Sequence, residues 1–212
     1  MQKLLTLIVI STALTACGKE IVNNNTTFPN ITTVQNQSVT PTTIEQIVEE
    51  QNALREAEGE DPLTLGLDCD LYTVPTSTTQ IIGATLNYVG SFEYLGDFNV
   101  QNSNVSTGLS ILPTNIQSIY QSWIILKCNG TLIVADNNYH EFDLSSDDGA
   151  NLYIDGLLIN NDGLHSIQTK SAAKFLGYGI HSFELDFFQA SGMQALILNE
   201  DGDVTDSSQF YH

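Results

Sequence analysis

Two adjacent carboxylates are the groups in this sequence best placed to do chemistry. Asp147 and Asp148 stand side by side, and Gly149, a turn-favouring residue, follows them. Like charges at this spacing repel, so the pair needs either a cation or several N–H donors to stay ionised. Ca²⁺ takes about 6 to 8 oxygen ligands, and carboxylates are among those it prefers. The motif therefore predicts either a calcium site or a tight turn whose acids accept backbone hydrogen bonds.

Cys17 is the next residue with a distinctive chemical setting. It ends the stretch Leu14-Thr15-Ala16-Cys17, after Lys3 and an apolar run over 4–14 that is too short to span a bilayer. The stretch resembles the bacterial lipobox, which implies cleavage before Cys17, diacylglycerol on its thiol and stable anchoring by several acyl chains. Gly18 follows the cysteine, and the absence of Asp there favours the outer membrane in a two-membrane cell. A plain secretory signal is the alternative.

The two remaining cysteines, Cys69 and Cys128, form an even pair. An exported chain folds in an oxidising compartment, where such a pair is expected to form a disulfide. Two separately buried thiols are the alternative. A metal site made by these two distant cysteines is not expected.

The composition of the N-terminal part of the chain predicts a membrane anchor followed by a spacer. We expect a signal peptide over residues 1–16. A disordered tether follows over 17–42, because Asn, Thr and Gln dominate there without an apolar period. Residues 43–62 predict a helix and a spacer, with the capping-box spacing of Thr43 and Gln46 at the start. This helix either mediates oligomerisation, or packs on the domain or acts as a semi-rigid spacer.

Residues 63–212 alternate apolar and polar side chains in short runs separated by Asn, Gly and Pro. Residues 182–187 alternate strictly, as expected of a strand with one buried face. Turn signals recur about every 8–12 residues, which is typical of an all-β sandwich or barrel. The late acids Asp201, Asp203 and Asp206 lack the Gly and Glu of an EF-hand calcium loop, so we interpret them as an exposed acidic tail.

A series of short motifs runs through the second half of the chain. They are Ser146-Asp147-Asp148-Gly149, Ile154-Asp155-Gly156, Asn161-Asp162-Gly163-Leu164-His165, Gly179 with His181, and the strands over 185–189 and 195–198. This series resembles the PA14 domain family, named after a fragment of the anthrax protective antigen. The resemblance covers about 66–200, best over 119–200, and makes 63–212 a PA14-like β domain. It implies an antiparallel β-sandwich or barrel, here with one short N-terminal helix.

The resemblance also implies a ligand class, because several family members bind carbohydrate. In the sugar-binding members, the acids matching Asp147 and Asp148 bind Ca²⁺ through a cis peptide. Those members add an Asn from a second loop near the end of the domain. In this sequence that loop offers Gln189, Ser191 and Gln194 in its place.

Two more residues are candidates for a ligand site. Asp162 and His165 could line a glycan site, and the alternative is a plain loop built on turn chemistry.

Charge and motif content exclude other function classes. The chain has 6 Lys+Arg against 25 Asp+Glu, a net charge of −19, which repels the phosphates of nucleic acids. Motifs of serine hydrolases, zinc proteases and phosphate-binding loops are absent, so we expect no enzymatic activity. We expect a lipid-anchored bacterial cell-surface protein, held on the outer membrane only by its lipid, that recognises carbohydrate or mediates adhesion with Ca²⁺ as its cofactor. The alternative is a non-enzymatic structural or assembly lipoprotein of the envelope that binds a protein partner.

Overall fold

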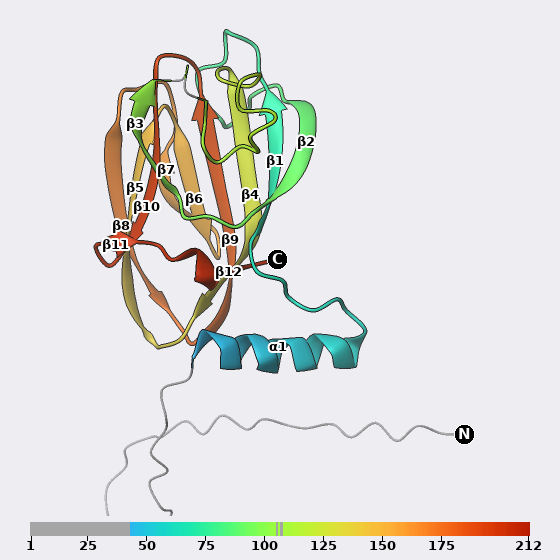
Figure 1. The fold of residues 1–212 in the computed structure, drawn as a ribbon. Helices are drawn as coiled ribbons and strands as arrows, with labels where there is room; N and C mark the ends of the chain where they lie inside the picture. The colour runs from blue at the N-terminus through green and yellow to red at the C-terminus, as the bar shows by residue number, and fades with distance from the viewer. Residues whose placement is uncertain (1–42, 105, 107) are drawn as a thin grey trace, which may run out of the picture. The chain divides into compact units, whose positions relative to one another are not determined.

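The strands of the chain form two antiparallel sheets that face each other (Figure 1). The computed structural model describes residues 43–104, 106 and 108–212. Cys17, together with the signal and tether expected over 1–42, lies outside the described residues. Among those described, no helix is both long and apolar enough to cross a membrane.

The larger sheet has the pairing of β4 with β9 at its centre. That pairing runs without a break from Ile124 opposite Gln189 to Val134 opposite Gly179. Across the sheet the order of strands is β2 (Asn87–Tyr94), β1 (Leu67–Thr73), β4 (Ile124–Val134), β9 (Gly179–Gln189), β6 (Ala150–Ile154) and β7 (Leu157–Asn161), with β12 (Phe210–Tyr211) also beside β4.

The smaller sheet has β5 and β10 at its centre, paired from Phe142 opposite Glu200 to Asp147 opposite Ala195. Its order is β11 (Asp203–Val204), β10 (Met193–Glu200), β5 (Asn138–Asp147) and β8 (Gln168–Leu176), with β3 (Asn99–Asn104) also beside β10. The all-β sandwich predicted from the sequence is confirmed.

The core lies between the two sheets and is made by alternate side chains of each strand. From the larger sheet come Phe183, Leu185 and Phe187 of β9, and from the smaller sheet Phe142 and Leu144 of β5, all at most 3% exposed. Each such burial stabilises the fold by about 1.5–3 kcal/mol. The strict alternation of residues 182–187 therefore marks a strand with one core face, as predicted.

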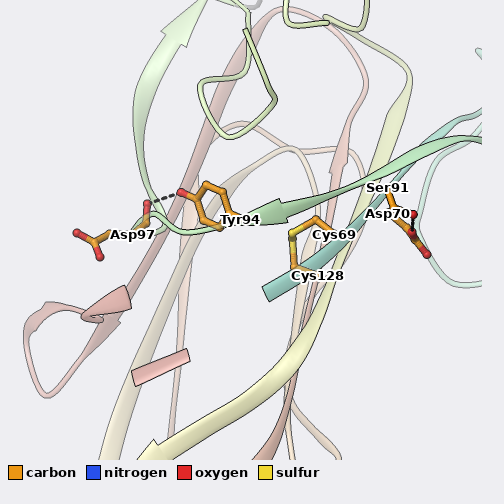
Figure 2. Close-up of a disulfide and its surroundings, with 6 residues drawn as sticks. All are labelled: Cys69, Asp70, Ser91, Tyr94, Asp97 and Cys128. Carbon is orange, nitrogen blue, oxygen red and sulfur yellow. Dashed lines mark hydrogen bonds between the residues drawn. A yellow bond between two sulfur atoms is a disulfide. The ribbon is translucent and has the colours of Figure 1, made fainter. Parts of the chain in front are cut away.

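The disulfide predicted between Cys69 and Cys128 is confirmed. The two residues lie directly opposite each other on β1 and β4, both fully buried, and their sulfurs are bonded (Figure 2). A bridge between residues separated by 59 positions stabilises the fold by about 4 kcal/mol, mainly by restricting the unfolded chain.

The predicted helix forms as α1 (Ile44–Glu58). It begins with the expected capping box, in which Thr43 and Gln46 exchange side-chain hydrogen bonds with each other's backbone N–H, and it ends at Gly59. Of its apolar residues only Ile47 is fully buried. The Asn52 side chain accepts a hydrogen bond from Leu63 N at 2.6 Å. These contacts are those of a helix packed on the chain that follows it, and a role in assembly stays a prediction.

The C-terminal segment corrects one expectation. Asp201, Asp203 and Asp206 are exposed, but they do not form a tail, because β11, a short 3₁₀ helix (Ser207–Gln209) and β12 follow Asp201. Phe210 of β12 is 1% exposed and packs on Phe183, with ring centroids 4.6 Å apart. The acidic residues of this segment concealed the docking, which depends on the burial of Phe210 and on the pairing of β12 with β4.

A second expectation fails at Asp186. Alternation places it on the solvent side of β9, yet it is 2% exposed. Lys127, opposite it on β4, donates a hydrogen bond to Asp186 Oδ2 at 2.7 Å. Burial raises the pKa of Asp186 to about 6, against the lowering effect of Lys127. Burial also lowers the pKa of Lys127, but the hydrogen bond and charge of Asp186 outweigh it, so that pKa is raised.

We predict that Lys127→Met destabilises the fold by about 3–5 kcal/mol at pH 7, because it leaves Asp186 charged and unpaired in the interior. A carboxyl whose folded-state pKa is raised loses stability as pH rises towards that pKa. The loss should therefore shrink at pH 5, where Asp186 is protonated in the folded state. Urea denaturation at both pH values measures the effect.

The double variant Lys127→Met/Asp186→Leu is the control for that experiment. It removes both charges, so most of the lost stability should return. An equal loss in Lys127→Met at pH 5 and pH 7 would contradict the assignment of the effect to a buried charge.

Candidate functional site

The Asp147-Asp148-Gly149 turn carries the chain from the smaller sheet to the larger one. Asp147 is the last residue of β5 and lies opposite Ala195 of β10. The Gly149 carbonyl accepts a hydrogen bond from Phe188 N of β9 at 2.7 Å. The peptide bond between the two acids is cis, as the family resemblance implied. The turn thus brings both carboxylates to one end of the sandwich, where the sheets meet.

Each acid receives a backbone hydrogen bond from a different loop. Asp147 Oδ2 accepts from Ile167 N at 3.1 Å, and Asp148 Oδ2 accepts from Ala190 N at 2.8 Å. Both acids are only 7% exposed. The turn interpretation requires such donors, and the calcium interpretation is compatible with them, since each carboxylate has a second oxygen.

The electrostatics of the pair favour a neutralising partner. Burial raises the pKa of Asp147, and the neighbouring Asp148 raises it further, against the Ile167 N–H and His165. Burial also raises the pKa of Asp148, against the N–H groups of Ala190, His165 and Ser191. Ionising such groups reduces stability as pH rises above the unfolded-state pKa. A bound cation would relieve both the burial and the mutual repulsion.

Gly149 is required by a close approach of two loops. A Cβ on this residue would lie 2.7 Å from Gly163 N and 2.9 Å from Gly163 O, which are backbone atoms that cannot swing aside. The loop after β7 is therefore pressed against the acidic turn. This contact is the reason why Gly follows the two acids.

His165 lies in that same loop and faces two carbonyl oxygens. Its Nδ1 is 3.0 Å from Ser166 O, and its Nε2 is 2.9 Å from Asn161 O. Carbonyl oxygens only accept, so the ring satisfies both contacts when both of its nitrogens carry protons. In that doubly protonated form, the ring lies near enough to Asp147 and Asp148 to lower the pKa of both carboxyls.

Asp162 holds a neighbouring loop in place. Its carboxylate accepts hydrogen bonds from Ile81 N at 2.7 Å, Ile82 N at 3.1 Å and Gly163 N at 2.8 Å. These contacts fit the loop interpretation of Asp162. A direct role of Asp162 or His165 in ligand binding stays a prediction.

The loop that Asp162 holds forms a polar hollow that the sequence analysis missed. The hollow has a volume of about 390 Å³ and is lined by residues 75, 77–80 and 82–85. It adjoins the loop after β7, because the Cβ position of Gly163 lies 3.9 Å from Thr79 O. The run of Ser and Thr over 76–79 indicates a polar loop in the sequence. Only the hydrogen bonds of Asp162 show that this loop lies beside the site.

The other predicted residues lie in the loop between β9 and β10 and at the strand ends beside it. Gln189 is fully buried and donates to Met193 O at 2.9 Å, and Gln194 is 1% exposed and donates to Gly108 O at 2.7 Å. The Oε1 atoms of both glutamines are buried without a hydrogen-bond partner. Ser191 is exposed. The two glutamines thus brace the loop that supplies Ala190 N to Asp148.

The metal-binding capacity of the site rests on Asp147 and Asp148. In the part of the chain that the structure describes, no third His, Cys, Asp or Glu joins them within ligand distance. The remaining ligands of a calcium ion would be carbonyl, amide or water oxygens, all of which Ca²⁺ accepts.

Comparison with known proteins identifies the family. The family model for the PA14 domain matches residues 91–203, which is more than half of the chain. The chain therefore belongs to the PA14 domain family. A search of curated proteins finds no match.

Solved structures agree with this fold. The PA14 domain of the MpAFP antifreeze protein has a TM-score of 0.56 at 15% identity, covering 71% of this chain and 92% of that one. The PA14 sugar-binding domain from an RTX adhesin has a TM-score of 0.54 at 18% identity, covering 70% and 99%. A subtype-switched epithelial adhesin A domain from Candida glabrata, in complex with β-lactose, has a TM-score of 0.52 at 11% identity, covering 68% and 84%. At these sequence identities, the structural similarity shows a shared fold alone.

We predict that Gly149→Ala destabilises the fold by about 1–3 kcal/mol, because its methyl group collides with the backbone of Gly163. The measurement is the midpoint of urea unfolding. Gly90→Ala is the matched control, since a Cβ there has no atom within 4 Å. Equal effects of the two substitutions would argue against the close loop contact.

Proposed function

We propose that this protein is a non-enzymatic, lipid-anchored surface protein whose PA14 domain recognises carbohydrate with the help of Ca²⁺ at Asp147 and Asp148. The observation that carries the proposal is the pair of adjacent carboxylates, each 7% exposed, at the crossing between the sheets. Burial raises the pKa of both carboxyls, so a nearby positive charge would stabilise their ionised forms. When bound, the ion would offer free coordination positions to sugar hydroxyls.

The surroundings of the acids support a neutral polar ligand. The hollow beside them is lined largely by hydroxyl and amide residues of the 75–85 loop. A chain with a net charge of −19 repels anionic ligands. A neutral glycan has many hydroxyl groups and no charge, so it meets both conditions.

The lipobox-like stretch before Cys17 supports the anchor, and the expected tether would hold the domain away from the membrane. The test is incorporation of labelled palmitate into the wild-type chain but not into Cys17→Ser. Equal labelling of both would overturn the anchor and leave the binding proposal intact.

The calcium proposal predicts that the full chain binds one Ca²⁺ in calorimetry, with a dissociation constant of about 10⁻⁴–10⁻³ M, as in other extracellular modules. Asp147→Asn/Asp148→Asn should abolish this binding. The matched control is Glu49→Gln/Glu50→Gln, an adjacent pair of exposed acids on α1. If both double variants lost calcium binding equally, the overall negative charge of the chain would explain the binding, and the proposed site would be contradicted.

A glycan array probed with the wild-type chain tests the ligand without any substitution. We expect binding to a restricted set of neutral glycans in calcium and its loss in chelator. Binding that survives chelation would overturn the role of calcium and keep the carbohydrate assignment. Absence of binding to any glycan in calcium would overturn the carbohydrate assignment.

One observation favours the alternative, a protein partner in the envelope. A hollow of about 780 Å³ lies along α1, between residues 45–60 of the helix region and Pro62 with Tyr211. Leu54 on the same helix is 56% exposed. A crosslinked envelope protein that is lost on deletion of residues 43–58, together with an empty glycan array, would favour this function.

A further inference from the structure

A second group of polar side chains lies at the other end of β5. His140 is seven residues before Asp147 on this strand, roughly 24 Å away at about 3.4 Å per residue. It meets Glu200, the last residue of β10, and Asp201, which follows. Together they line a hollow of about 320 Å³. This group is therefore separate from the acidic turn.

The two ring nitrogens of His140 have different neighbours. Nε2 lies 3.1 Å from Asp136 Oδ1, to which it donates. Nδ1 is buried and lies 2.9 Å from Glu200 Oε1 and 3.3 Å from Asp201 Oδ2. In the tautomer that carries its proton on Nε2, the Nδ1 lone pair faces the same two carboxylate oxygens.

These spacings are those of ligands around one ion. Atoms held about 2.1 Å from a metal at angles of roughly 90–109° lie about 3.0–3.4 Å apart. The three ligand atoms of His140, Glu200 and Asp201 all lie within 4.8 Å of one another, the one such group in the described residues.

The carboxylates are held in place by contacts that leave one oxygen of Asp201 free. Asp201 Oδ1 accepts from Glu141 N at 2.9 Å, so that Oδ2 faces the histidine. This backbone contact fixes the Asp201 side chain with one carboxylate oxygen directed towards His140.

An independent observation also points to a ligand. Thr205 lines the same hollow and is 3% exposed, and its Oγ1 is buried without a hydrogen-bond partner. A buried hydroxyl without a partner is destabilising unless water or a ligand satisfies it. A water molecule on a bound ion would supply that partner.

We propose that His140 Nδ1, Glu200 Oε1 and Asp201 Oδ2 form a binding site for a transition-metal ion of the zinc class. An imidazole ligand favours Zn²⁺ over Ca²⁺, which prefers oxygen ligands alone. Asp136 orients the ring by accepting its Nε2–H, an arrangement that metal-binding histidines commonly have. Three protein ligands leave a fourth position open for water. The side chain of Asp201 is 55% exposed, so the ion enters from solvent.

Calorimetry with ZnCl₂ on the full, chelator-treated chain tests the site, with millimolar Ca²⁺ present to occupy the acidic turn. We expect one Zn²⁺ per chain. His140→Gln and Glu200→Gln should each weaken binding by at least a factor of about 100, and Asp136→Asn by about tenfold. Asp203→Asn is the matched control, since it removes an exposed acid two residues from Asp201, and binding should not change.

Nitrogen NMR of the four histidine rings in the chain gives a second, independent readout. Zinc should shift Nδ1 of a single histidine, assigned as His140 by its loss in His140→Gln. Equal zinc binding by the wild type and His140→Gln would overturn the proposal, as would a wild-type spectrum that zinc leaves unchanged.

Discussion

The long pairing of β4 with β9 is the constraint on which the other features depend. Its register sets Lys127 opposite Asp186, and it brings the end of β9 beside Ile124. The same strand β4 carries Cys128, which bonds to Cys69 on β1. A slip of one residue would turn every side chain of β9 to the other face. The core, the ion pair and the loop that supplies Ala190 N therefore share one register.

The smaller sheet positions the two groups of buried carboxylates. β5 carries His140 near its start and Asp147 at its end, and β10 supplies the partner residues near the first of these positions. Both groups bury carboxylates whose pKa values are raised by desolvation. In a chain with a net charge of −19, few basic side chains are available to neutralise them. The proposed calcium and zinc sites would each place a cation against these carboxylates.

Short-range patterns predicted much of this structure. The capping box of α1, the strands with one apolar face and the turn at Gly149 each depend on residues a few positions apart. The disulfide between Cys69 and Cys128 was predictable from the count of cysteines and the expected compartment. The family resemblance added the sandwich and the cis peptide at Asp147.

Other features depend on contacts between distant segments. The sequence pattern places Asp186 on the solvent side of β9, yet its side chain is buried and hydrogen-bonded to Lys127 of the neighbouring strand. The exposed acids around residue 201 concealed the docking of Phe210. The 75–85 loop reaches the site only because Asp162 binds its backbone. None of these contacts leaves a local period in the sequence.

The sequence by itself determined the all-β architecture, the helix boundaries and the acidic turn, because periodicity and turn chemistry act within a few residues. Only the tertiary structure decided which polar side chains are buried away from solvent. His140 and Glu200 are 60 positions apart in the chain, yet their side chains meet at 2.9 Å. Burial and proximity of this kind arise from strand register and sheet packing, which alternate side chains specify only collectively.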